Sequence, residues 1–209
     1  MIFAILFILT VIYNKYESNR AEENSKRLLS SYISEITSEL PTESEYEQTS
    51  EYNETVSEIA SNENMWLDAA DYPINISTDM VIGVLSIPSI SLNMPVINIT
   101  TDELLTVSLC RYNTTNIGED GNIVICGHNY IDGSHFGRLS SLNTGDEVIL
   151  SDRSGKTYSY TVYETEMIMP TEVDKVEKYI GGKNLTMFTC DATGDKRYVV
   201  RCKEKNKEI

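Results

Sequence analysis

Basic residues, paired cysteines and long apolar runs are scarce in this 209-residue sequence, and each scarcity excludes a class of protein. The 17 lysines and arginines are outnumbered by 32 acidic residues, so the chain lacks the clustered positive charge with which nucleic-acid-binding proteins neutralise phosphates. Four cysteines are too few for a disulfide-stabilised scaffold of this length. None of them forms a C-x-x-C pair, the spacing typical of structural zinc sites.

The longest apolar run covers only residues 2–13. Its twelve residues fall short of the roughly 20 that a bilayer-spanning helix needs. Two explanations remain open: the sequence starts inside a longer membrane anchor, or the run is an uncleaved signal segment. Because no small-x-small cleavage site follows the run, we favour a truncated anchor over residues 1–13. Either explanation places the rest of the chain outside the cell.

The negative charge is concentrated near the start of the chain. Residues 14–79 hold four basic and fifteen acidic side chains, a net charge of −11 out of −15. Residues 42–64 consist mainly of Glu, Ser, Thr and Asn, and such a segment cannot bury enough apolar surface to offset the entropy lost on ordering. We therefore interpret residues 14–64 as an acidic stalk followed by a flexible linker.

A helical pattern lies inside this stalk. Apolar residues recur at helical spacing at Leu29, Ile33, Ile36 and Leu40, and Pro41 ends the pattern. The spacing predicts a short amphipathic stalk helix. It is either a weak surface helix with no partner, or a helix that forms a coiled coil or lies on a membrane surface.

From residue 81 onward the sequence has the character of a β protein. Short apolar or alternating runs separated by glycine and proline cover residues 81–87, 92–97, 122–126, 147–150, 158–169, 185–190 and 197–202. This pattern predicts a mainly β fold, a closed barrel or a sandwich. We expect it to form one catalytic domain over residues 81–209, with residues 65–80 as its N-terminal extension.

Two short helices are expected between these strands. They cover residues 101–108 and 171–180. In the second, Thr171 and Asp174 resemble a capping box directly after Pro170.

Cys190 is the candidate nucleophile. A cysteine in an apolar β-run is ordinarily a small buried hydrophobic residue. Here Thr189 precedes it and Asp191 follows it, at the point where the run gives way to a glycine-containing loop. That polar context favours a thiol used in covalent catalysis.

His128 is the candidate general acid and base, because an imidazole exchanges protons near neutral pH. It directly follows the run that ends at Cys126, whereas His135 lies in a glycine-flanked loop and is expected to be exposed. Arg197 is the candidate for stabilising an oxyanion. Arg201 is on the same strand face and is the second candidate for this role, ranked lower because it is farther from the Cys190 loop. An arginine on a strand face is more often exposed to solvent.

A zinc site is the competing interpretation of these residues. Cys126 and His128 could coordinate a metal together with Cys190 and either Cys110 or Cys202.

Taken together and in this order, the motifs resemble those of the sortases, the cysteine transpeptidases of Gram-positive bacteria. The resemblance covers about residues 81–203. GVLSIP from Gly83 resembles the family's opening strand, and GNIVICGHN from Gly121 resembles the strand that delivers the catalytic histidine. TMFTC, which ends at Cys190, resembles the TLxTC signature, and Arg197 lies seven residues later, where the family has its arginine.

The resemblance implies an eight-stranded sortase β-barrel tethered to the membrane by its N-terminal segment. It implies cleavage of a Leu-Pro-x-Thr-Gly-like sorting signal of a surface protein between Thr and Gly. Cys190 would form a thioacyl intermediate, His128 would protonate the leaving amine, and Arg197 would hold the substrate carbonyl and its oxyanion. An amine of a peptidoglycan precursor, or the lysine of another protein, would resolve the intermediate.

The substrate groove is expected to include Cys126, Phe188, Thr189 and Val173. Cys126 stands where the family commonly has Ala, which suggests the hypothesis of a regulatory disulfide between Cys126 and Cys190. No cofactor is expected. Glu119, Asp120 and Glu172 could offer calcium ligands, but acidic loops are so common here that no calcium site is predicted.

Two alternative functions stay open at this point. The first is a cysteine endopeptidase in which water resolves the acyl-enzyme, and the second is a non-catalytic binding barrel. Within the family, the short segment between Cys190 and Arg197 resembles class D or class A rather than class B.

Overall fold

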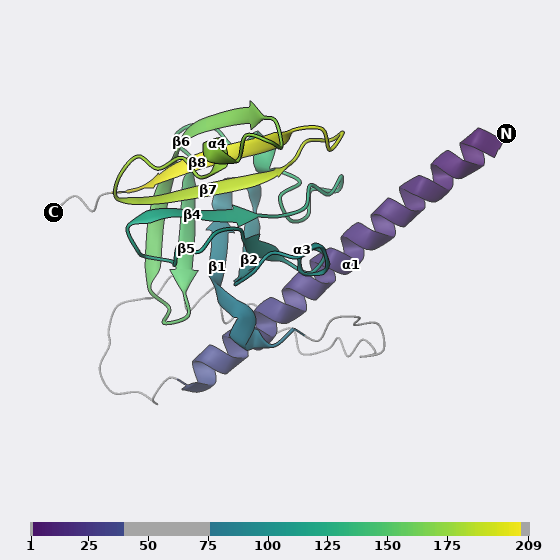
Figure 1. Cartoon of the computed structure of the whole chain (residues 1–209). Helices are drawn as coiled ribbons and strands as arrows, with labels where there is room; N and C mark the ends of the chain where they lie inside the picture. Colours follow the sequence, from purple (N-terminus) through teal and green to yellow (C-terminus); the bar gives the residue numbers. More distant parts are fainter. Residues whose placement is uncertain (1, 40–75, 206–209) are drawn as a thin grey trace.

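The computed structural model describes residues 2–39 and 76–205 (Figure 1). Its eight strands close into a barrel in the order β1-β2-β3-β4-β7-β8-β6-β5. The β2–β3 and β4–β7 pairs are parallel and the other pairs are antiparallel. The prediction of a mainly β, closed eight-stranded barrel is confirmed.

The strands begin and end close to the predicted runs. They are β1 (Val81–Ile87), β2 (Leu92–Ile97), β3 (Leu109–Arg111), β4 (Gly121–Cys126), β5 (Glu147–Asp152), β6 (Thr157–Ile168), β7 (Lys183–Cys190) and β8 (Arg197–Glu204). The residue pattern did not predict β3. This strand pairs only two residues with each of its neighbours, so it is too short to show an alternating pattern.

The barrel interior is filled by one side of each strand. Leu185 and Met187 of β7, and Val200 and Cys202 of β8, belong to the main core with exposed fractions of 0%. Because successive side chains of a strand point to opposite faces, the residues between them point out of the barrel. The predicted catalytic residues Cys190 and Arg197 belong to this outer set.

The short helices are α3 (Asp102–Leu105) and α4 (Val173–Val176), each about one turn, together with the 3-10 turns η2 (Thr78–Met80), η3 (Pro88–Ile90) and η4 (Leu139–Ser141). Both predicted helices are present but shorter than expected. The predicted capping box at Thr171 and Asp174 is wrong, because α4 begins at Val173 and its N-cap, Glu172, makes no side-chain cap. The Glu172 side chain accepts a hydrogen bond from the Met169 N–H instead.

The N-terminal segment forms one continuous helix, α1 (Ile2–Glu39). The expectation of a separate stalk helix without a partner is wrong, because the second half of α1 packs on the barrel. Leu28, Leu29 and Tyr32 are buried there against a cluster that includes Val81 and Val84 of β1.

The first half of α1 projects away from the barrel (Figure 1). Its apolar side chains from Phe3 to Tyr13 are all exposed. Within residues 2–39 and 76–205, we find no helix whose length and hydropathy together suit a transmembrane span. The predicted flexible part of the linker, residues 42–64, lies outside the described residues.

Candidate active site

Strand pairing brings the three predicted catalytic residues to one edge of the barrel. β4 and β7 are parallel, with Cys126 opposite Phe188, so the ends that lead to His128 and Cys190 lie together. β8 is antiparallel to β7, and this register places Arg197 directly opposite Cys190. Residues that are far apart in the sequence therefore converge because of the sheet topology.

A groove of about 330 Å³ lies over this edge. All seven predicted site residues line it: Cys126, His128, Val173, Phe188, Thr189, Cys190 and Arg197. Pro170 and Val176 also line it, and they belong to the segment over residues 169–180 that was expected there. The structure adds Ile168 and the polar groups of Thr100 and Asp102. The groove is thus a mostly apolar channel with a thiol, an imidazole and a guanidinium on its wall.

Cys190 is the accessible thiol of the chain. All four cysteines are free, and Cys190 is the half-buried one, while Cys110, Cys126 and Cys202 are buried. Burial raises the pKa of the Cys110 and Cys202 thiols far above the ordinary value and that of Cys126 to about 11. Because a thiolate is the reactive form, accessibility and burial both favour Cys190 as the nucleophile.

His128 follows Gly127, where a larger residue would crowd two buried core side chains. A Cβ atom there would lie 2.6 Å from Leu109 Cδ2 and 3.0 Å from the Phe136 ring. Burial lowers the pKa of the His128 imidazole below its ordinary value, although the carboxylates of Asp102 and Glu17 act in the opposite direction. The imidazole is therefore mainly neutral at pH 7, so it can accept a proton and later return it.

The Arg197 guanidinium is available to a substrate. Its Nη1 donates to the carbonyls of Gly194 and Lys196 at 3.1 Å each, and no carboxylate in the described part of the chain forms an ion pair with it. A guanidinium in this state can donate its remaining hydrogen bonds to a developing oxyanion.

Arg201 differs from the expectation of a solvent-exposed side chain. It is 1% exposed, and its guanidinium pairs with Glu164 and Glu166 at 3.2 and 2.9 Å. The prediction that Arg201 is exposed is wrong, because the segment before β7 covers this part of β8.

The Thr189 side chain connects two parts of the site. The buried Thr189 hydroxyl donates to the Gly127 carbonyl at 2.7 Å and so ties β7 to the turn before His128.

Cys126 is opposite Phe188, two residues from Cys190, which corresponds to a diagonal Cα separation of about 8 Å between Cys126 and Cys190. A disulfide needs Cα atoms within about 7 Å, so the hypothetical Cys126–Cys190 bridge would require the backbone to move.

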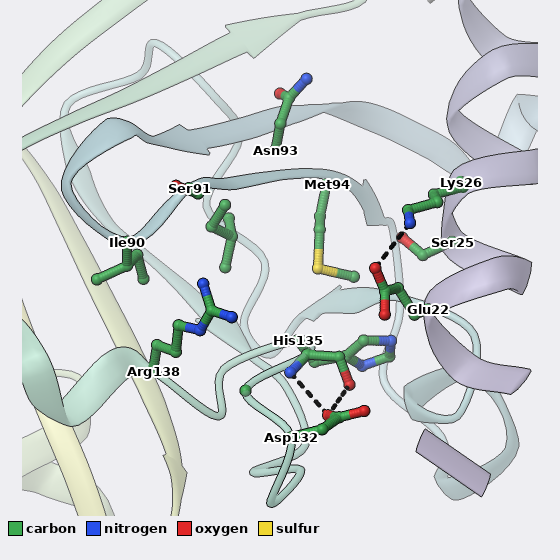
Figure 2. Close-up of a pocket in the computed structure, with 13 residues that line it drawn as sticks. Glu22, Ser25, Lys26, Ile90, Ser91, Asn93, Met94, Asp132, His135 and Arg138 are labelled. Atoms are coloured by element: carbon green, nitrogen blue, oxygen red, sulfur yellow. Dashed lines mark hydrogen bonds and ion pairs between the residues drawn. The ribbon is translucent and has the colours of Figure 1, made fainter. Parts of the chain in front are cut away.

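His135 is the second departure from expectation. It is 3% exposed rather than an exposed loop residue, because α1 lies over it, and Figure 2 shows its ring beside Glu22 and Ser25 of this helix. A backbone bridge to Asn129 holds it in place. The Tyr130 ring lies between the two histidines, with centroids 5.4 Å from His128 and 5.1 Å from His135.

Among the site residues that sequence reasoning missed, two make specific contacts. Asn129 donates from Nδ2 to the Cys190 carbonyl at 2.8 Å, and its place directly after His128 was a signal that could have found it. Tyr112 packs edge-on against Phe188 at 5.1 Å. Tyr112 directly follows β3. Because this strand was not predicted, the position of Tyr112 could not be predicted either.

The zinc alternative has no support in the geometry. Cys202 lies in the barrel core, on the opposite face of the sheet from Cys126. Among the described residues, no group of three or more His, Cys, Asp or Glu side chains is arranged to hold a metal ion. The arrangement instead suits acyl transfer, with a thiol, a proton-transfer group and an oxyanion partner at one groove.

Known proteins share these features. Residues 85–205 match the Sortase family, described as the sortase domain. The chain is 34% identical to sortase A of Bacillus anthracis over 123 residues, which cover 57% of this chain and 58% of that protein. It spans somewhat over half the length of the curated relatives that it matches.

Solved structures agree with the fold. The structure of Listeria monocytogenes sortase A has a TM-score of 0.55 and 29% identity, covering 61% of this chain and 89% of that one. A Clostridium perfringens sortase D5 transpeptidase has a TM-score of 0.55 and 26% identity, covering 63% of this chain and 83% of that one. Proteins named as class A and class D thus match to the same degree.

Proposed function

The chain belongs to the sortase family of cysteine transpeptidases, and on this premise we propose that it cleaves a Leu-Pro-x-Thr-Gly-like sorting signal between Thr and Gly and transfers the acyl product to an amine. The observation that carries the proposal is the register of β7 and β8, with Cys190 opposite Arg197 and His128 on the same groove. The likeness to both class A and class D relatives supports either subclass.

The mechanism follows from the positions of the three groups. His128 takes the proton of the Cys190 thiol, and the sulfur attacks the Thr carbonyl carbon. The C=O electron pair moves onto the oxygen, where Arg197 donates hydrogen bonds to the oxyanion. The oxyanion collapses, the C–N bond breaks, and His128 gives its proton to the leaving Gly amine. An incoming amine then attacks the thioester, loses a proton to His128 and releases the Cys190 thiolate.

The acceptor in this proposal is an amine of a peptidoglycan precursor or a protein lysine. The competing reaction is plain hydrolysis, in which water takes the place of the amine. A quenched Leu-Pro-x-Thr-Gly peptide, incubated with and without a short peptide amine, separates the two. We expect an amine adduct by mass spectrometry; hydrolysis alone at saturating amine would refute the transferase assignment.

The nucleophile is tested in the same assay. Cys190→Ala should lower peptide cleavage by more than about 1,000-fold, because the covalent route is lost. It should leave the fold intact, since Cys190 lies at a strand end on a half-buried position. Cys110→Ala is the matched control, because it removes a thiol that does not line the groove. Turnover by Cys190→Ala at the control's rate would contradict the assignment of Cys190 as nucleophile. A non-catalytic barrel predicts a different result, in which neither protein cleaves the peptide.

We further propose that the chain is attached to a cell membrane through the start of α1, with the barrel outside the cell. The support is the exposed apolar surface of this helix from Phe3 to Tyr13. A helix that is apolar all round is suited to lipid or to a protein core. The full chain should float with phosphatidylcholine vesicles, and a Leu6→Asp/Leu9→Asp variant should not; equal flotation of both proteins would contradict the attachment.

A further inference from the structure

One wall of the groove is formed by residues 169–182, the segment between β6 and β7. It contains α4, whose Val173 and Val176 line the groove beside Phe188. Val176 packs on Val124 and Val199 of the outer sheet face. A helix of four residues satisfies little of its own backbone hydrogen bonding, so the shape of this wall depends on contacts from the barrel.

Those contacts come from the same sheet face that carries Cys190. Side chains on β7 alternate, so Asn184, Thr186 and Cys190 share one face. The register places Arg201 of β8 and Val124 of β4 beside Thr186 on that face. Near the end of β7, the outer face therefore carries apolar side chains and the reactive thiol of Cys190. Toward the start of β7, it carries the buried polar side chains of Asn184 and Thr186.

Arg201 is the strongest of these contacts. Its Nη2 and Nε donate to the Lys175 carbonyl of α4 at 2.7 and 3.2 Å. Its charge is balanced by Glu164 and Glu166 of β6. A guanidinium presents several donors in a fixed plane, so this side chain fixes α4 relative to β6 and β8 at once.

Two buried asparagines hold the rest of the segment. Asn122 Nδ2 donates to the carbonyls of Val176 and Lys178 at 3.3 and 3.2 Å, and its Oδ1 accepts from Thr186. Asn184 accepts from the Ile180 N–H and donates to the Gly181 carbonyl, both at 3.0 Å. The wall is therefore held by side chains of three strands and not by its own secondary structure.

We propose that Arg201 is a positioning residue for the substrate groove: its bonds to the Lys175 carbonyl hold α4 so that Val173 and Val176 face the sorting signal. Arg201 does not touch the reacting atoms, and it acts through α4. The inference deepens the proposed function and rests on it. Because a wall residue contacts the substrate in both its ground state and its transition state, loss of the clamp should raise KM and leave kcat nearly unchanged.

The test compares full-length Arg201→Met with the unmodified chain. The methionine keeps an apolar side chain but removes every donor, and the two freed glutamates are about one-third exposed and can be solvated. We expect KM for the sorting peptide to rise about 10-fold and kcat to change less than about 3-fold. Arg201→Lys, which keeps the charge and a donor, should recover part of the affinity.

Lys178→Met is the matched control. The Lys178 ammonium pairs with the same Glu164 at 3.0 Å, but it makes no side-chain bond to the α4 backbone. This variant should keep the KM of the unmodified chain. An equal rise of KM in Lys178→Met would show that surface charge, and not the clamp, sets substrate affinity, and would overturn the inference.

Hydrogen exchange provides a readout that needs no substrate. Amides of residues 173–181 should exchange faster in Arg201→Met than in Lys178→Met, while amides of β1 and β2 stay unchanged. Unchanged exchange in this segment, or a uniform acceleration across the barrel, overturns the positioning role. If the unmodified chain does not cleave the peptide, the proposed function fails, and exchange still decides whether Arg201 holds α4.

Discussion

Helices α1 and α4 both pack on the barrel, and they are attached to it by different interactions. α4 is held by directional hydrogen bonds from buried polar side chains, chiefly from Arg201 to the Lys175 carbonyl. α1 is held by close contact of buried small and apolar residues, among them Ser18, Ala21 and Ser25, and by an ion pair between Glu35 and Arg153 at 2.9 Å. The first attachment depends on donors and charge throughout, whereas the second depends, around Ala21, on shape and on keeping charge out.

His135 makes the second attachment sensitive to charge. Its ring lies against the Ala21 and Glu22 side of α1. Burial lowers the pKa of His135 to about 4. A neutral imidazole therefore fills the contact at pH 7 as an apolar ring would.

The largest effect should come from a charge placed in this contact. Ala21→Glu buries a carboxylate without a partner, which costs about 3 kcal/mol of unfolding free energy and lowers the melting temperature of the full chain by about 10 °C. Peptide cleavage should also fall, because α1 contacts the loop that carries His128: Ser18 and Ser134 are hydrogen-bonded at 3.0 Å. Scanning calorimetry and the peptide assay measure both effects.

Ser30→Glu is the control for this variant, since Ser30 lies exposed on the same helix. It should melt within a degree or two of the unmodified chain. If Ala21→Glu and Ser30→Glu melt together, the contact between α1 and the barrel contributes nothing to stability.

A smaller effect should follow from acidification. The folded-state pKa of His135 lies below the ordinary value of about 6.5, so the unfolded state binds more protons and stability falls as the pH drops from about 6.5 toward 4. Between pH 7.5 and 5 the loss should be about 2 kcal/mol. Denaturant unfolding at several pH values measures it.

His135→Phe isolates this contribution from those of the neighbouring His128, Asp132 and Glu22. Phenylalanine fills the same space and does not titrate, so its stability curve should be flatter over the same pH range. The α4 attachment should not respond, because Arg201 donates to the Lys175 carbonyl, an acceptor that does not titrate. Desolvation raises the pKa of the Glu166 carboxyl, but hydrogen bonds from Arg201 and Lys175 outweigh it, so this pKa lies below its ordinary value. If the unfolding free energies of His135→Phe and of the unmodified chain fall with the same slope as the pH drops, another group causes the pH dependence.

The strands and the three proposed reacting residues were predictable because their signals are local. Short apolar or alternating runs mark β1, β4, β7 and β8 within a few residues of their observed ends. The motifs around His128 and Cys190 stand at the ends of such runs. β3 was missed because three residues carry no period.

The attachment of α1 was not predictable from the apolar pattern. Leu29, Ile33 and Ile36 do face the barrel, yet the contact extends through Ser18, Ala21 and Ser25. Serine and alanine are common on exposed helix surfaces, so their spacing does not distinguish a buried stripe from a solvated one.

The sequence by itself determined where seven of the eight strands lie and which side chains supply a thiol, an imidazole and a guanidinium. The tertiary structure alone decided that Arg201 and His135 are buried. Strand and helix periods follow from the geometry of the local backbone, so a short stretch of chain reveals them. Burial of a polar side chain depends on which distant segment packs over it. Here α4 packs over Arg201 and α1 packs over His135.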